Sequence, residues 1–289
     1  MDYLSRALFV CLQSDLSDVS RPKDMTLALD DCSTQSAAVT QRSQKMRMRS
    51  GIANPLDSRR RIHGVLFDLD GTLYRQRRMR AFMAIELLMR AFAHPLRAPR
   101  NWRALTTYRH AQEIVRSRPI DDPRAQLEIA AARSGLKPAE IEQIVGEWMF
   151  ERPLKYLPRC RAAGLLQLIA FLESKNLELG VLSDYPAEAK LRALGLDGRF
   201  SAVVCSTDPE IGVLKPHPRG FLTVCDRWQI DPSEVLVVGD RVEVDAAGAT
   251  AAGMPCVVIG RASPSPPDTP EVLFVPSLER LRYVLSDCC

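Results

Sequence analysis

The 289-residue sequence contains no run of about 18 apolar residues, the length that a membrane-spanning helix requires. Its first residues, MDYLSRALFVCLQ, lack a basic start and a long apolar stretch, so we expect no secretory signal. None of the 8 cysteines forms a CxxC pair, and no histidine accompanies them at zinc-ligand spacing. We therefore expect buried, reduced cysteines in a cytoplasmic protein that has no membrane partner.

The sequence also lacks a strong excess of charge of one sign. A net charge of +4 is too small to indicate a nucleic-acid-binding protein. The basic excess is local, because residues 75–157 carry 16 Lys and Arg against 9 Asp and Glu. A basic segment beside an active site favours a small anionic substrate. Nothing in the sequence indicates the oligomeric state.

Residues 1–60 have little hydrophobic periodicity and are rich in Ser, Asp, Arg and Gln. Such a composition buries too little apolar surface to order a chain, so it predicts a disordered N-terminal extension. Two origins for this extension stay open. It is either a targeting segment or the result of a translation start placed upstream of Met25, Met46 or Met48.

Three patterns follow this extension. Residues 62–68 form a short apolar run that ends at acidic residues and a glycine, which predicts a buried strand and a turn. Residues 78–152 repeat apolar residues at steps of three and four, which predicts helices. From residue 160, Val/Leu/Ile runs alternate with helical segments, the pattern of a parallel sheet that is covered on both faces.

These patterns predict an α/β protein with a doubly wound, Rossmann-like parallel sheet. The core is expected at residues 61–74 and 158–289, and a helical cap is expected at 75–157, inserted after the first strand. A doubly wound sheet binds its ligand outside the carboxyl ends of its strands. The insert leaves the first strand at that end, so we expect it to cover the site as a lid.

Polar residues lie where the predicted strands end. They are Asp68 and Asp70 after the first strand, Ser183 at the second, Lys215 after the third, and Asp240 and Asp245 after the fourth. Asp184 is left out of this set, because it precedes Tyr185-Pro186 and is expected to cap the next helix. If the strands are parallel, the side chains of the set converge on one edge of the sheet.

The chemistry of this set is coherent. Carboxylates are hard oxygen ligands that suit Mg²⁺, and Asp68, Asp70 and Asp240 are the candidates. A carboxylate at the end of the strand, Asp68, is placed to attack phosphorus, and Asp70 is placed to protonate the leaving oxygen and then activate water. A lysine offsets the negative charge that gathers during phosphoryl transfer, which is the role expected of Lys215.

Two smaller groups of residues complete the predicted site. Ser183 is expected to bind the phosphoryl oxygens together with Lys215. Gly71 and Thr72 permit a tight turn that presents backbone N–H groups to the same oxygens.

The motifs DLDGT, the strand-end Ser183, Lys215 before Pro216, and GDRVEVD occur in the order found in the haloacid dehalogenase superfamily, which residues 62–275 resemble. The likeness is greatest to its phosphoglycolate phosphatase-like branch, which carries a helical cap after the first strand. The resemblance implies an aspartyl-phosphate intermediate on Asp68. True dehalogenases of the superfamily lack an acid at the position of Asp70, so its presence favours phosphoryl chemistry.

The resemblance also implies a ligand set. Mg²⁺ would be held by Asp68, the backbone carbonyl of Asp70, and Asp240, while Asp245 would support the metal site or pair with Lys215. The function expected is a magnesium-dependent phosphatase that acts on a small phosphate monoester. Two alternatives stay open at this point, a phosphomutase of the same superfamily and a non-catalytic regulatory or binding protein on this fold.

Overall fold

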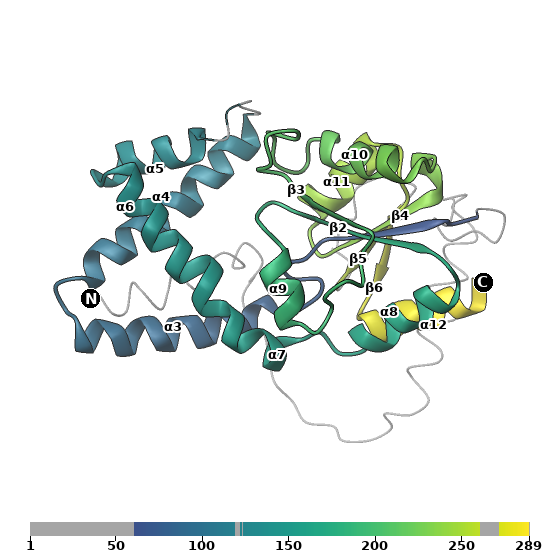
Figure 1. Cartoon of the computed structure of the whole chain (residues 1–289), viewed down its shortest axis with the longest axis horizontal. Coiled ribbons are helices and arrows are strands. Elements are labelled where there is room, and N and C mark those ends of the chain that lie inside the picture. Colours follow the sequence, from purple (N-terminus) through teal and green to yellow (C-terminus); the bar gives the residue numbers. More distant parts are fainter. Residues whose placement is uncertain (1–60, 119–121, 123, 261–271, 289) are drawn as a thin grey trace, which may run out of the picture. The chain divides into compact units, whose positions relative to one another are not determined.

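The computed structural model describes residues 61–118, 122, 124–260 and 272–288 (Figure 1). The predicted disorder of residues 1–60 lies outside these residues. In the described part of the chain, no helix has both the length and the apolar character that crossing a membrane requires.

The core of the fold is a sheet of six strands in the order β3-β2-β1-β4-β5-β6. Every neighbouring pair is parallel, as predicted. The strands are β1 (Gly64–Phe67), β2 (Glu178–Ser183), β3 (Ala202–Cys205), β4 (Val235–Gly239), β5 (Cys256–Ile259) and β6 (Val272–Val275). The first strand is central, because Phe67 pairs with Val181 of β2 on one side and with Val238 of β4 on the other.

Helices cover both faces of the sheet, which explains why the strands are apolar at nearly every position. Val65 and Phe67 face one buried cluster, whereas Leu66, between them, faces the other. The first cluster includes residues of α8 (Leu165–Ser174), α9 (Glu188–Ala193) and α12 (Leu278–Cys288), and the second includes residues of α10 (Arg219–Trp228) and α11 (Ala247–Ala251). Figure 1 shows α8 beside α12, away from α10 and α11. The predicted α/β class is therefore confirmed.

A block of helices separates β1 from β2 along the chain. It contains α3 (Gln76–Ala93), α4 (Ala98–Ser117), α5 (Ala125–Ser134), α6 (Pro138–Val145), η2 (Gly146–Glu151), η3 (Arg152–Tyr156) and α7 (Leu157–Cys160). Ala104, Ala130, Ile141 and Trp148 form part of a buried cluster within this block. We call the block the helical insert. The cap boundaries at residues 75 and 157 stay a prediction.

Four cysteines fall within the described residues with their burial assigned. Cys160, Cys205, Cys225 and Cys256 are buried and free of disulfides. Their burial agrees with the prediction that they serve as small core residues.

Two short helical segments complete the core, η4 (Pro232–Glu234) and η5 (Val242–Ala246), and η5 carries Asp245.

Candidate active site

The carboxyl ends of β1, β2 and β4 lie side by side and carry polar residues. Asp68 follows β1, and its N–H donates to the Val238 carbonyl at 2.8 Å, which extends the pairing with β4. Asp240 follows β4 directly, and Ser183 is the last residue of β2. The parallel register therefore brings residues that are distant in sequence to one edge of the sheet, as a doubly wound fold requires.

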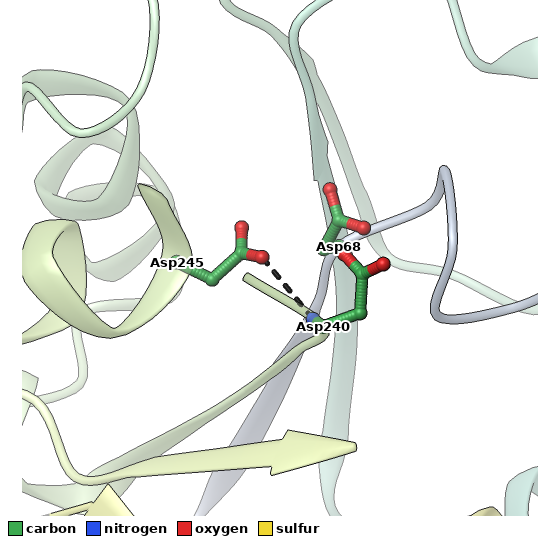
Figure 2. A group of neighbouring side chains, drawn as sticks. All are labelled: Asp68, Asp240 and Asp245. Atoms are coloured by element: carbon green, nitrogen blue, oxygen red, sulfur yellow. Dashed lines mark hydrogen bonds between the residues drawn. The ribbon is translucent and has the colours of Figure 1, made fainter. Parts of the chain in front are cut away.

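Three carboxylates form a tight cluster at this edge (Figure 2). Asp68, Asp240 and Asp245 each offer an oxygen atom, and these atoms all lie within 4.8 Å of one another. Both oxygens of Asp245 already accept hydrogen bonds. Its Oδ1 accepts from Lys215 at 2.8 Å, and its Oδ2 accepts the N–H of Asp240 at 3.2 Å and of Arg241 at 3.1 Å. Asp245 thus stabilises the turn after β4 by accepting hydrogen bonds from its backbone.

Lys215 is the cation of this cluster. Its Nζ donates to Asp68 Oδ1 and to Asp245 Oδ1, and the residue is only 4% exposed. Burial alone would lower the pKa of Lys215, but the carboxylates of Asp245 and Asp68 outweigh it and raise the pKa. The ammonium group therefore stays charged at neutral pH and in contact with the predicted nucleophile.

One ammonium does not balance three carboxylates. Burial raises the pKa of Asp68 well above its ordinary value, and although Lys215 opposes this, Asp245 and Asp240 add to it. Burial and Asp245 raise the pKa of Asp240 to about 7. Both shifts reflect negative charge without enough counter-charge, which a divalent cation would supply. The hard oxygen donors of Asp68 and Asp240 suit Mg²⁺, so the cluster fits the predicted metal.

The turn after β1 approaches the cluster closely because it contains a glycine. Gly71 has φ +111°, and a Cβ built on it would lie 2.0 Å from Asp240 Oδ2. Only a residue without a side chain lets the Asp240 carboxylate occupy this position. The neighbouring Thr72 is buried and donates from Oγ1 to Asp68 Oδ2 at 3.1 Å. The predicted pair Gly71 and Thr72 therefore shapes the acidic cluster directly.

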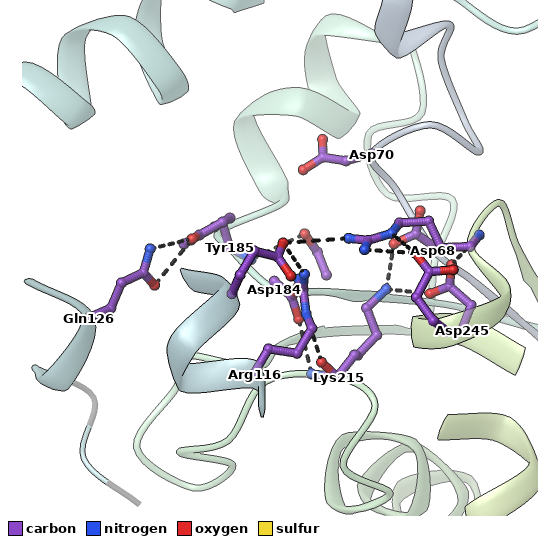
Figure 3. A network of polar contacts seen from close by, with 12 residues as sticks. Asp68, Asp70, Arg116, Gln126, Asp184, Tyr185, Lys215 and Asp245 are labelled. Carbon is purple, nitrogen blue, oxygen red and sulfur yellow. Dashed lines mark hydrogen bonds and ion pairs between the residues drawn. The ribbon is translucent and has the colours of Figure 1, made fainter. Parts of the chain in front are cut away.

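Asp70 lies apart from this cluster, and Figure 3 shows its carboxylate well separated from Asp68 and Lys215. The Nζ of Lys190 donates to both of its oxygens, at 2.7 and 2.9 Å, and the Tyr74 hydroxyl donates to Oδ1 at 2.5 Å. Burial would raise the pKa of Asp70, but Lys190 first and Tyr74 second outweigh it and lower the pKa. Asp70 is therefore ionised, and the hydrogen bonds from Lys190 and Tyr74 fix the orientation of its carboxylate.

The sequence did not predict Lys190 and Tyr74 as partners of Asp70. A signal for Lys190 exists, since Ala187, Leu191 and Leu194 are buried at helical spacing and Lys190 lies on the same face. A lysine at a core-facing position of a helix needs an anionic partner, and the acids at the sheet edge are the obvious candidates. For Tyr74 the only signal is its proximity in sequence to Asp70.

The predicted role of Asp184 as a helix cap is wrong. α9 begins at Glu188, its N-cap residue is Ala187, and no side chain caps it. Asp184 instead accepts the N–H of Lys215 at 3.2 Å through Oδ1 and pairs with Arg116 of α4 at 2.6 Å through Oδ2. The neighbouring Ser183 is buried, and its Oγ accepts the N–H of Tyr185 at 3.3 Å.

A model of the haloacid dehalogenase-like hydrolase family matches residues 62–253. Because this match covers more than half of the sequence, the chain belongs to that family. The expected membership of the superfamily is therefore confirmed, and the family places the chain among hydrolytic enzymes.

The curated relatives of this chain include several phosphatases. A glyceraldehyde 3-phosphate phosphatase from Methanopyrus kandleri is 29% identical over 69% of this chain and 84% of its own length. A phosphoglycolate phosphatase from Shigella dysenteriae is 28% identical over 68% of this chain and 80% of its own. Among solved structures, a 2-haloacid dehalogenase from Pseudomonas syringae aligns with a TM-score of 0.54 and 25% identity, over 79% of this chain and 100% of that chain.

Proposed function

We propose that the protein is a magnesium-dependent phosphatase that hydrolyses a small phosphate monoester through an aspartyl-phosphate on Asp68. The observation that carries the proposal is the contrast between the surroundings of the Asp68 and Asp70 carboxylates. Asp68 lies against the Lys215 ammonium inside an acidic cluster, whereas Asp70, two residues on, is held ionised by Lys190. Environments that separate two carboxylates in this way typically assign them different roles in one reaction.

In the first half-reaction, an Asp68 oxygen forms a bond to phosphorus as the bond to the leaving oxygen breaks. The leaving oxygen takes a proton from the Asp70 carboxyl group, so this step uses the protonated form of Asp70, which the contacts with Lys190 and Tyr74 disfavour before substrate binds. The phosphoryl oxygens are bound by Lys215, by the Ser183 hydroxyl and by backbone N–H groups of the turn at Gly71 and Thr72. Lys215 is buried and keeps its charge, so its attraction for the transferring group is weakly screened.

In the second half-reaction, water attacks phosphorus and Asp70 takes the proton that the water loses. The acyl-phosphate bond breaks, which releases inorganic phosphate and restores the Asp68 carboxylate. The lowered pKa of Asp70, maintained against burial by Lys190 and Tyr74, favours the ionised form that this step requires.

Mg²⁺, when bound, would neutralise the charge that Asp68, Asp240 and the phosphoryl group bring together. Asp68 and Asp240 would hold it with side-chain oxygens and Asp70 with its backbone carbonyl. Asp245 supports this arrangement through the N–H groups of Asp240 and Arg241.

A small anionic phosphorylated metabolite is the proposed substrate class. The relatives named above act on glyceraldehyde 3-phosphate and phosphoglycolate, which are both small phosphate monoesters. The basic excess of residues 75–157 fits an anionic substrate, because such a charge attracts it to the site.

Purified protein assayed against a panel of phosphorylated metabolites with Mg²⁺ tests the proposal. We expect release of inorganic phosphate from small monoesters, and loss of nearly all of it in folded Asp68→Asn. Unchanged turnover in Asp68→Asn would exclude the mechanism. Activity only in the presence of a bisphosphorylated sugar would favour a phosphomutase, and binding without turnover would favour the regulatory alternative.

A further inference from the structure

Arg116 lies on α4, in the helical insert, but its side chain reaches the edge of the sheet that carries the active site (Figure 3). The side chain is 9% exposed, and each of the three guanidinium nitrogens donates a hydrogen bond. Its Nε donates to the Lys215 carbonyl at 3.0 Å, one Nη to Asp184 at 2.6 Å, and the other to Glu113 at 2.6 Å. The insert thus supplies a buried cation that contacts the backbone of Lys215.

Asp184 completes this contact from the sheet side. Its Oδ1 accepts the Lys215 N–H at 3.2 Å, while its Oδ2 pairs with Arg116. The backbone of Lys215 is therefore held at both polar groups, the N–H by Asp184 and the carbonyl by Arg116. Asp184 directly follows Ser183, so its contact with Lys215 links the segment that carries Ser183 to Lys215. Ser183 and Lys215 are the two side chains proposed to bind the phosphoryl oxygens. We call Arg116, Asp184 and the Lys215 backbone the clamp.

The burial of the clamp makes it costly to separate. The side chains of Arg116 and Asp184 are 9% and 10% exposed, and removing one member of such a pair leaves the other charge without compensation. A partly separated pair is unfavourable for the same reason. The clamp is therefore formed when α4 is docked against the core and broken when α4 moves away.

The position of Lys215 matters because its Nζ contacts Asp68. A shift of the Lys215 backbone moves the ammonium relative to the nucleophile and to the phosphoryl oxygens. Displacements of about 1 Å at a reacting centre cost on the order of 100-fold in rate. A contact that fixes this backbone therefore acts on the chemical step.

We propose that Arg116, acting through the clamp, is a positioning residue for Lys215, so that the lysine takes its working position only when α4 of the insert is docked. The catalytic consequence rests on the function proposed above. The structural consequence, an ordered Lys215 backbone, is independent of that function.

A second contact between the insert and the same loop provides a matched control. Gln126 of α5 donates to the Tyr185 hydroxyl at 2.8 Å and to the Tyr108 carbonyl at 3.1 Å, and the Tyr185 hydroxyl donates back at 3.2 Å. Gln126 is buried, and the Arg116 side chain is similarly little exposed, but these hydrogen bonds do not involve Lys215. Gln126→Leu therefore removes a contact between the insert and this loop without changing any atom of the clamp.

The test compares Arg116→Met, Asp184→Asn, the double variant and Gln126→Leu. Turnover of p-nitrophenyl phosphate with saturating Mg²⁺ gives kcat and KM, and hydrogen exchange followed by mass spectrometry reports on the peptide that contains Lys215. Thermal melting identifies any variant that fails to fold.

We expect kcat of Arg116→Met to fall by about 10- to 100-fold, with a much smaller change in KM. The double variant should lose little more than either single variant, because both remove the same clamp. The Lys215 peptide should exchange faster in Arg116→Met, whereas Gln126→Leu should keep kcat within about twofold and leave that exchange unchanged.

Two results overturn the proposal. One is a kcat of folded Arg116→Met within about twofold of the wild type. The other is that Arg116→Met and Gln126→Leu lose the same amount of kcat and show the same exchange at the Lys215 peptide. Arg116 would then be a general docking contact and not a positioning residue. If the wild type itself shows no phosphatase activity, the proposed function fails, and the exchange comparison alone then decides whether the clamp orders Lys215.

Discussion

Substitution of Gly71 by alanine gives the most direct test of the geometry around the acidic cluster. A Cβ at this position would lie 2.0 Å from Oδ2 and 2.6 Å from Cγ of Asp240, whereas ordinary contacts begin at 3.4 Å. Because real Cβ atoms essentially never approach another atom closer than 3.0 Å, the turn or the Asp240 carboxylate must move by at least 3.0 − 2.0 = 1.0 Å. Either movement separates Asp240 from Asp68 or shifts the N–H groups of the turn.

The expected effect on turnover follows from this displacement. A misplacement of about 1 Å costs on the order of 100-fold, so we expect kcat of Gly71→Ala to fall by at least about that factor, roughly 3 kcal/mol of transition-state stabilisation. The apparent affinity for Mg²⁺ should weaken as well. In Gly71→Ala, the φ of +111° at this position adds about 1–3 kcal/mol of backbone strain to the folded state.

Gly198→Ala separates these two effects. Gly198 also has positive φ, +66°, but a Cβ there meets no atom within 4 Å. This variant should lose a similar amount of stability to backbone strain and keep the kcat of the wild type. The assay is a magnesium titration of p-nitrophenyl phosphate turnover for both variants, with urea unfolding for stability. Wild-type kcat in Gly71→Ala, or an equal loss in Gly198→Ala, would show that the close approach of Gly71 to Asp240 does not position the site.

Three further predictions concern the charges of the site. Lys215→Met should abolish turnover. Without metal at neutral pH it should also lower the free energy of unfolding by about 3–5 kcal/mol, because Asp68 and Asp245 lose their buried cation. An unchanged urea midpoint would contradict this loss of stability. Lys190→Met should shift the basic limb of the kcat/KM–pH profile to higher pH, because kcat/KM reports the first half-reaction, in which Asp70 gives up a proton, and the loss of Lys190 lets the pKa of Asp70 rise; an unmoved limb would exclude this contact from the reaction. Removal of metal with EDTA should abolish turnover and added Mg²⁺ should restore it, whereas full activity in EDTA would exclude the metal role proposed for Asp68 and Asp240.

The parts of the fold that the sequence predicted are those governed by local pattern. The apolar runs at β1 and β4 are buried on both faces, so their composition alone indicates a covered parallel sheet. Parallel strands share one carboxyl edge, and this places Asp68, Asp240 and Asp245 together without any further information. The Lys215 side chain contacts Asp68 from a loop that follows β3.

The partners of these residues were harder to predict because tertiary packing selects them. Arg116 is one of 16 basic residues in 75–157, and nothing local distinguishes it from the exposed ones. Its contact with Lys215 spans 99 positions in sequence. Asp184 was misassigned because an acid before a predicted helix commonly caps it, whereas here two tertiary partners occupy both of its oxygens.

In the proposed mechanism, Asp68 carries the phosphoryl group during turnover. The most direct measurement is an acid quench of the enzyme during turnover of a radiolabelled phosphate monoester, followed by identification of the labelled peptide by mass spectrometry. We expect label on the peptide that contains Asp68, formed and lost at rates that match turnover, and none in Asp68→Asn. Turnover without label at any time of quenching, or label at a different residue, would contradict it.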